Sequence, residues 1–186
     1  LIVEEREAEE FDEKAVEDYL ASREKEELGQ EIPMAQACPS ARLQTFVPKH
    51  LAEETTAQTS ALSHWPVQIN LVPPTAPFLK GADLLVAADC APVAYPNFHR
   101  DFLKGKAVMV GCPKFDDVKG YVEKFADIFR SANIKSVTVL DMEVPCCSAL
   151  PKIVKRGMEL AGKSVPLEEV VISARGEILK REKAAA

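Results

Sequence analysis

Three strand-like runs of this chain each end in cysteine. The runs and their cysteines are residues 82–89 with Cys90, residues 106–111 with Cys112, and residues 136–140 with Cys146 and Cys147. Each run is rich in β-branched and apolar residues, which is typical of strands buried on both faces of a parallel sheet. Because the carboxyl ends of parallel strands share one edge, where open α/β sheets bind ligands, the pattern predicts that these cysteines meet there.

Helical patterns separate the strand-like runs. Asp116 can cap a helix that runs to about Ala132, and a second helix is expected from Ser148 to Ala161. Further strands are predicted at residues 67–72 and 168–173. Strands that alternate with helices favour a three-layer α/β fold with a five-stranded, mostly parallel sheet of the Rossmann or flavodoxin-like type.

Charge and pattern divide the chain into four parts. These are an acidic helical arm at 1–32, a cysteine-bearing loop region at 33–66, the α/β domain at 67–180, and a tail at 181–186 whose final alanines suggest a vector remnant. The arm holds 13 acids and 4 bases, and a thin apolar stripe predicts a helix from Glu9 to Arg23. Its negative charge argues against a nucleic-acid partner, because phosphate binding needs clustered positive charge.

Several classes of protein are disfavoured by what the sequence lacks. The five cysteines are an odd number, and no signal-peptide pattern is recognisable, so a disulfide framework is not expected. No apolar run is long enough to cross a bilayer. We therefore expect a cytoplasmic protein with no membrane partner. The chain has no glycine-rich dinucleotide or Walker sequence, no G-x-S-x-G elbow and no H-E-x-x-H.

The cysteines are the best candidates for chemistry. Soft thiolate ligands select zinc, copper(I) or iron–sulfur clusters. The predicted metal ligands are Cys38, Cys90, Cys112, Cys146 and Cys147. The first of these would come from the preceding loop. The spacing includes no Cys-x-x-Cys pair and no ferredoxin-type run, so this prediction rests on the strand ends, and the alternative is cysteine as a small buried hydrophobe.

Within the adjacent pair, Cys147 is the expected ligand. It lies just before a predicted helix, whose positive dipole end favours a thiolate. His99 could be a ligand or a proton donor, but an ordinary structural role as a surface histidine is the favoured interpretation. Asp89 and Asp141 lie near strand ends, where they could tune a site or cap helices.

Four stretches carry a resemblance to a known family. They are Trp65-Pro66-Val67-Gln68, residues 82–90, Gly111-Cys112-Pro113-Lys114 and residues 142–147. Together they resemble the C-terminal region of ferredoxin-fused iron–sulfur proteins of anaerobic microbes. Those proteins begin with a two-cluster [4Fe-4S] ferredoxin domain, which is absent from this chain. The chain departs from the family at Ala37, Ser40 and Ser148, where glycines are usual.

The resemblance implies an iron–sulfur redox domain with a [4Fe-4S] cluster. Its expected partner is the ferredoxin domain or another electron-transfer protein. Two alternatives stay open: a metal-free thiol redox enzyme or sensor that uses Cys146 and Cys147, and a zinc-stabilised interaction module. The sequence also leaves open whether the chain forms a homo-oligomer, and whether it is itself catalytic or a component of an oxidoreductase.

Overall fold

The computed structural model describes residues 43–45 and 59–184. The predicted helix of the acidic arm and the loop that carries Cys38 lie outside the described residues. Among the described residues, no helix is long and apolar enough to span a membrane.

A five-stranded sheet with the order β4-β3-β5-β6-β7 forms the centre of the domain. The strands are β3 (Asp83–Ala88), β4 (Ala107–Gly111), β5 (Ser136–Met142), β6 (Leu167–Ile172) and β7 (Ile178–Ala184). The first four are parallel, and β7 runs antiparallel to β6. The predicted α/β fold with a mostly parallel sheet is therefore confirmed.

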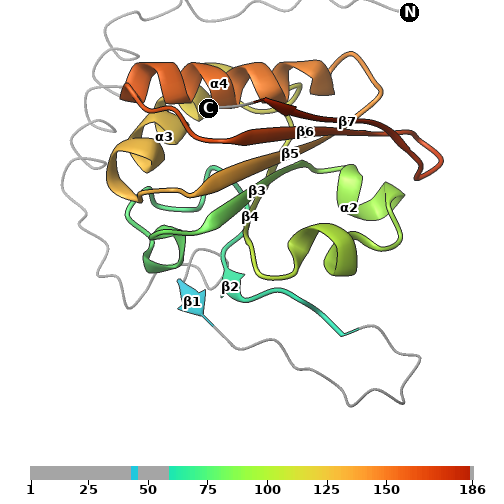
Figure 1. Cartoon of the computed structure of the whole chain (residues 1–186), viewed down its shortest axis with the longest axis horizontal. Helices are drawn as coiled ribbons and strands as arrows, with labels where there is room; N and C mark the ends of the chain where they lie inside the picture. The colour runs from blue at the N-terminus through green and yellow to red at the C-terminus, as the bar shows by residue number, and fades with distance from the viewer. Residues whose placement is uncertain (1–42, 46–58, 185–186) are drawn as a thin grey trace, which may run out of the picture. The chain divides into compact units, whose positions relative to one another are not determined.

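Helices cover both faces of this sheet, as Figure 1 shows. They are α2 (Ala91–Ala94) and the π-helical turn η4 (His99–Leu103) after β3, α3 (Val118–Ser131) after β4, and the 3₁₀ turn η5 (Cys147–Ala149) with α4 (Leu150–Ala161) after β5. The helices α3 and α4 pack together through Gly157, where a Cβ atom would lie 2.6 Å from the Cβ of Phe125. A residue without a side chain is therefore needed at this contact.

The ends of the long helices follow from local sequence. Asp117 caps α3 by accepting a hydrogen bond from the Lys119 amide at 2.9 Å, so the cap is one residue later than predicted. Pro151 lies in the first turn of α4, where its missing N–H costs nothing. Gly162 ends α4 in the left-handed conformation, with φ of 63°, as the sequence predicted.

The predicted strand at residues 67–72 is wrong, and the fifth strand of the sheet lies in a segment where no strand was predicted. Residues 67–72 form a single bridge, from Gln68 to Val110, and then turn. The fifth strand is β7, whose residues 181–184 were expected to be a tail. A hairpin that includes Gly176, at φ of 83°, connects β6 to β7. β7 is an edge strand, and edge strands often carry charged side chains. Its mostly charged sequence therefore gives only a weak hydrophobic pattern.

The opposite edge of the sheet, at β4, is covered by residues 64–69. Strand β2 (His64–Trp65), which pairs with β1 (Gln44–Thr45), brings the buried His64 ring against β4. Its Nε2 atom accepts a hydrogen bond from the Val108 amide at 2.9 Å, and its Nδ1 atom lies 3.2 Å from the Pro66 carbonyl oxygen. The ring also stacks on Phe78, with centroids 3.9 Å apart. These partners require a neutral ring with its proton on Nδ1.

This arrangement predicts a pH dependence of stability. Burial lowers the pKa of His64 in the folded protein below its ordinary value of 6.5. The unfolded chain therefore binds the proton more readily, so the free energy of unfolding falls as the pH drops below about 6.5 and levels off below the folded pKa. We expect the His64→Gln variant, measured by urea unfolding at pH 7 and pH 5, to lose less stability over this interval than the wild type. Equal losses in both proteins would contradict the assignment.

Candidate functional site at the carboxyl edge of the sheet

The strand order defines a switch point in the sheet. The chain passes from β3 to β4 on one side, then crosses to β5 on the other side of β3 and continues to β6. The direction of winding therefore reverses between β3 and β5, and such a crevice at the carboxyl ends of the strands is where open α/β sheets bind ligands. Cys90 follows β3, Cys112 follows β4, and Cys146 and Cys147 follow β5. The loops that carry these cysteines are thus neighbours along one edge.

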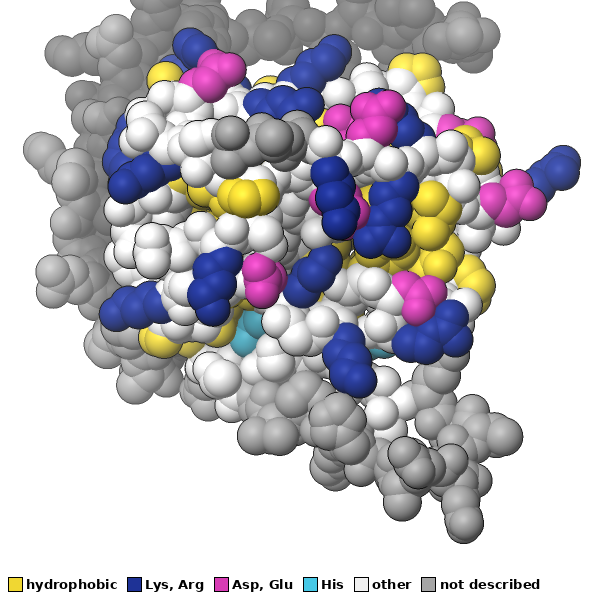
Figure 2. All heavy atoms as spheres, viewed as in Figure 1, with side chains coloured by type: hydrophobic (Ala, Val, Ile, Leu, Met, Phe, Trp, Pro, Cys, Tyr) yellow, Lys and Arg dark blue, Asp and Glu magenta, His cyan; other side chains and the backbone are white. Residues whose placement is uncertain are grey.

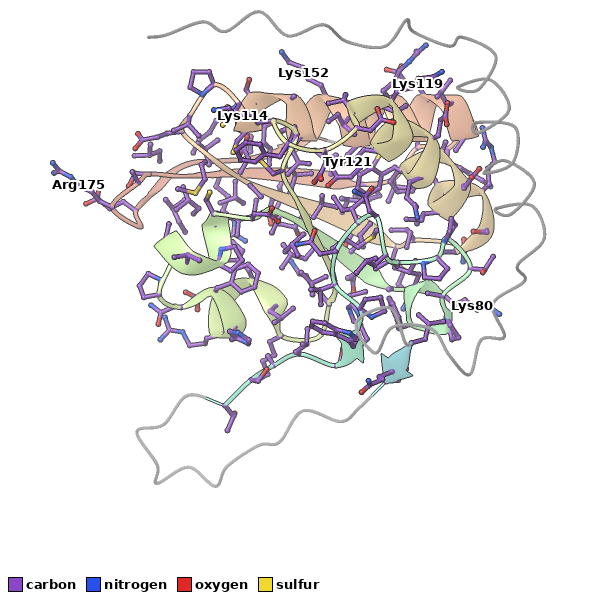
Figure 3. The ribbon with its side chains drawn as sticks, turned by 180° about the vertical axis from the view of Figure 1, so that it is seen from behind. Lys80, Lys114, Lys119, Tyr121, Lys152 and Arg175 are labelled. Atoms are coloured by element: carbon purple, nitrogen blue, oxygen red, sulfur yellow. The ribbon has the colours of Figure 1, made fainter. Side chains whose placement is uncertain are left out.

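A hydrogen-bonded turn fixes the half-buried Cys112. The Cys112 amide donates to Asp116 Oδ2 at 3.1 Å, and the Cys112 carbonyl accepts from the amides of Phe115 and Asp116 at 3.1 and 3.0 Å. The Tyr121 hydroxyl donates to the same Asp116 oxygen. The pKa of Tyr121 is raised, mainly by burial and secondly by this hydrogen bond. The phenol therefore stays protonated and holds Asp116 in place. Tyr121 is fully buried beneath α3, where Figure 3 labels it, whereas Lys114 is exposed.

This support of Cys112 is not predicted by the sequence, which favours Asp116 as a helix cap and indicates no role for Tyr121. The available signal was Gly111, the residue just before Cys112. A Cβ atom there would collide with the Tyr121 hydroxyl and lie 2.8 Å from Ile69 Cδ1, so the glycine marks a close approach of the aromatic side chain to the strand end.

The other cysteines differ in exposure. Cys90 is exposed, and its carbonyl accepts hydrogen bonds from the Val93 and Ala94 amides at 3.2 and 3.0 Å. Cys146 is also exposed, whereas Cys147 is only 3% exposed. The Cys147 amide donates to the Val144 carbonyl at 3.0 Å, which closes the turn that leads into η5. Of the adjacent pair, Cys146 is therefore the one open to solvent.

The expected stabilisation of a Cys147 thiolate is wrong. The pKa of Cys147 is raised to about 11, chiefly by burial; a hydrogen bond from the Met142 backbone acts in the opposite direction, and the nearby Cys146 and Asp141 add smaller increases. Cys147 lies in the 3₁₀ turn that precedes α4, inside the hydrophobic core, so desolvation outweighs the helix-end effect on which the prediction rested. Exposure now favours Cys146 over Cys147 as a ligand.

The remaining predicted site residues have separate surroundings. His99 Nδ1 accepts a hydrogen bond from the Ala61 amide at 3.1 Å, which is a structural role. Asp89 is exposed and accepts from the Gln68 side chain at 3.5 Å. Asp141 is 3% exposed, and burial, followed by the charge of Glu169, raises its pKa to about 6. Within residues 43–45 and 59–184, no three His, Cys, Asp or Glu side chains are gathered closely enough to hold a metal ion.

The strand order and the helices on both faces of the sheet define an α/β protein of the doubly wound class. Its cysteine-bearing loops lie at the switch point of the sheet. Residues 76–186 match the family described as a Rossmann-like domain, and the chain belongs to that family. It is similar to an uncharacterized protein of Archaeoglobus fulgidus (strain ATCC 49558), with 38% identity over 117 residues, which are 63% of this chain and 82% of that protein. No solved structure shows a significant match to the chain. The resemblance to ferredoxin-fused proteins therefore stays a prediction.

The close approach at Gly111 gives a test of the support for Cys112. We expect Gly111→Ala to lower the free energy of unfolding by about 1–3 kcal/mol, because the added methyl group overpacks the space beside Tyr121. In a Tyr121→Phe background the same substitution should cost less, since the hydroxyl oxygen is the atom closest to the new Cβ. Urea unfolding of the four proteins measures both costs. An equal cost in both backgrounds would show that Tyr121 is not the obstacle.

Proposed function

We propose that this domain is a redox protein that holds an iron–sulfur cluster at the switch point of its sheet. The observation that carries the proposal is the strand order β4-β3-β5, which makes neighbours of three cysteine-bearing loops far apart in sequence. The outer two strands of this set lie two strand spacings apart, about 10 Å. Loops that extend beyond the strand ends can bring their side chains together over this distance.

The donor chemistry fits such a cluster. Cys90 and Cys146 are exposed and Cys112 is half-buried, so these three thiols are accessible from one edge. When bound, an iron–sulfur cluster would supply one-electron transfer, at a potential set by charge, burial and hydrogen bonds to sulfur. Because the described side chains are not gathered into a metal-binding group, the proposal requires loop movement that is coupled to metal binding. Cys38 remains a predicted further ligand outside the described residues.

Anaerobic reconstitution tests this proposal. We expect wild-type protein to take up iron and sulfide and turn brown, and single Cys→Ser variants at positions 90, 112 and 146 to lose most of both. Cys147→Ala is the matched control: it should lower the free energy of unfolding, because it removes a buried group, but keep the metal content. Counts of iron and sulfide per chain decide the outcome. Full metal content in the variants at positions 90, 112 and 146, or none in the wild type, overturns the proposal.

A metal-free thiol function is the second candidate. It is favoured by the adjacency of Cys146 and Cys147, whose thiols are close enough for Cys146 to raise the pKa of Cys147. However, consecutive Cα atoms are about 3.8 Å apart, which is shorter than the usual Cα separation across a disulfide, so a bond between these two sulfurs would strain the backbone. The raised pKa of Cys147 also disfavours the thiolate that attacks a disulfide. The same reconstitution experiment separates this candidate and the zinc module from the cluster, because zinc analysis accompanies the iron count.

We further propose that an electron-transfer protein docks beside Cys90 and Cys112. Val93 and Phe115, on the segments that follow these cysteines, are 88% and 82% exposed. Lys114 lies over the Phe115 ring at 5.6 Å and adds a positive charge. Figure 2 also shows apolar side chains gathered between α2 and the β6–β7 hairpin. Exposed apolar groups of this kind mark interaction surfaces.

The docking proposal predicts a selective kinetic defect. With cluster-loaded protein, Phe115→Ser should slow electron transfer from a reduced two-cluster ferredoxin at least about tenfold, because an exposed aromatic anchor is lost. The rate with dithionite, a small reductant that needs no protein interface, should stay unchanged. Stopped-flow absorbance measures both rates, and Leu160→Ser, on an exposed apolar residue of α4, is the control. Slowing with both reductants, or with neither, contradicts docking at Phe115.

A further inference from the structure

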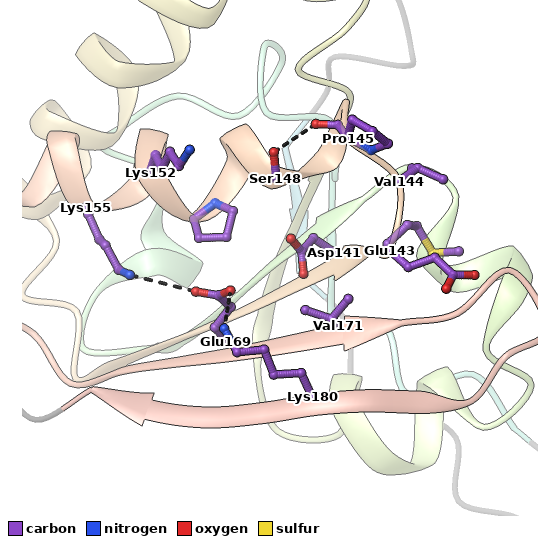
Figure 4. Close-up of a pocket in the computed structure, with 12 residues that line it drawn as sticks. Asp141, Glu143, Val144, Pro145, Ser148, Lys152, Lys155, Glu169, Val171 and Lys180 are labelled. Atoms are coloured by element: carbon purple, nitrogen blue, oxygen red, sulfur yellow. Dashed lines mark hydrogen bonds and ion pairs between the residues drawn. The ribbon is translucent and has the colours of Figure 1, made fainter.

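A second feature of the carboxyl edge is a cavity of about 370 Å³ between the sheet and the start of α4. Its floor follows from the strand register: Asp141 on β5 is opposite Val171 on β6, which is opposite Lys180 on β7. Pro151 and Lys152, in the first turn of α4, form part of its wall. Figure 4 shows Asp141, Val171, Lys180 and Lys152 around the opening. The cavity lies on the β5–β6 side of the switch point.

Asp141 is the unusual residue of this cavity. It is 3% exposed, and its Oδ1 atom has no hydrogen-bond partner among the described residues. A buried polar atom without a partner costs about 1–3 kcal/mol, so it calls for a specific reason. In Figure 4 the carboxyl group lies between Ser148 and Glu169, at the base of the cavity. A ligand with an N–H donor would satisfy it, and a cationic donor would do so most strongly.

The lysines of the cavity are not equivalent. Glu169 pairs with Lys180 at 3.3 Å and with Lys155 at 3.8 Å. Lys152 is exposed and has no carboxylate partner in the described part of the chain. In Figure 4 its nitrogen end points toward the side where Ser148 lies. An anionic group of a ligand could therefore pair with Lys152 without displacing an existing ion pair.

The charges that line the cavity indicate which charges a bound ligand should carry. It contains three acids, Asp141, Glu143 and Glu169, and three lysines, so it is formally neutral. Met142, Val144, Pro145, Pro151 and Val171 supply apolar surface. A ligand with one positive and one negative group and an apolar body matches this lining, whereas an ion with a single charge would leave one side unsatisfied.

We propose that this cavity binds a small α-amino acid with an apolar side chain. Its ammonium group donates to Asp141, its carboxylate pairs with Lys152, and its side chain contacts Val171 and Pro151. This inference does not rest on an iron–sulfur cluster, because no cysteine takes part in it. The turn between β5 and α4 nevertheless carries Pro145 and Ser148 of the cavity together with Cys146, so the bound molecule would lie beside the proposed redox site.

Calorimetry with matched probes tests the inference on the full chain. The probes are L-alanine, L-valine and L-leucine, with 4-methylpentanoate and 3-methylbutylamine as leucine analogues that lack the amino group or the carboxylate. We expect at least one amino acid to bind, with leucine favoured by the apolar walls, and each leucine analogue to bind at least about tenfold more weakly, because each loses a charge-assisted contact. Binding of none of the three amino acids, or equal binding of leucine and both analogues, overturns the proposal.

Two variants test which residue binds the ammonium group of the ligand and which binds its carboxylate. Asp141→Asn should weaken binding of leucine and of the amine about tenfold but leave the acid unchanged, and Lys152→Met should weaken leucine and the acid but leave the amine unchanged. Lys163→Met, on an exposed lysine just after α4 and outside the cavity, is the control and should change nothing. If Asp141→Asn does not fold, Lys152→Met and the analogue series still decide the question. Unchanged leucine binding in Lys152→Met overturns the assignment.

Discussion

The pairing of β3 with β4 on one side and with β5 on the other is the constraint on which the rest of the structure depends. The register places Ala88 opposite Gly111, and Ala87 opposite Leu140, so the three strands end close to one level. Every residue that follows these strands then falls at a common edge. Cysteines that are distant in sequence become neighbours because the backbone hydrogen bonds between these buried strands place their loops side by side. The spacing of the cysteines along the chain does not determine this arrangement.

Much of this fold can be read from sequence because its strands and helices repeat strong patterns. The segments that form β3, β4 and β5 are continuous and apolar. The glycine at position 162 marks a helix end, because glycine readily adopts the left-handed conformation found there. β7 was missed because a mostly charged edge strand carries little hydrophobic signal. The alternation of residues 67–72 predicts a strand, although in the structure these residues cover the edge of β4. In both cases tertiary position outweighed local pattern.

The candidate site was only partly predictable. That Cys90, Cys112, Cys146 and Cys147 follow strand ends is visible in the sequence, and the structure places their loops side by side. Their different exposure is not visible, since it depends on how η5 sinks Cys147 into the core while Cys146 stays outside. The cavity at Asp141 was equally hidden, because its lining comes from three strands and a helix, and only the folded register makes Val171 and Lys180 its neighbours.

The two borders of the sheet have a consequence for how this molecule meets others. On the β4 side, His64 and Val67 already occupy the amides of Val108 and Val110. On the β7 side, the outermost strand carries Lys180, Arg181, Glu182 and Lys183 in succession. A foreign strand would find its hydrogen-bonding positions taken on one border and would have to approach a dense row of solvated charges on the other. Among the described residues, both borders of the sheet thus resist the addition of a further strand that would lengthen it into a fibril-like ribbon.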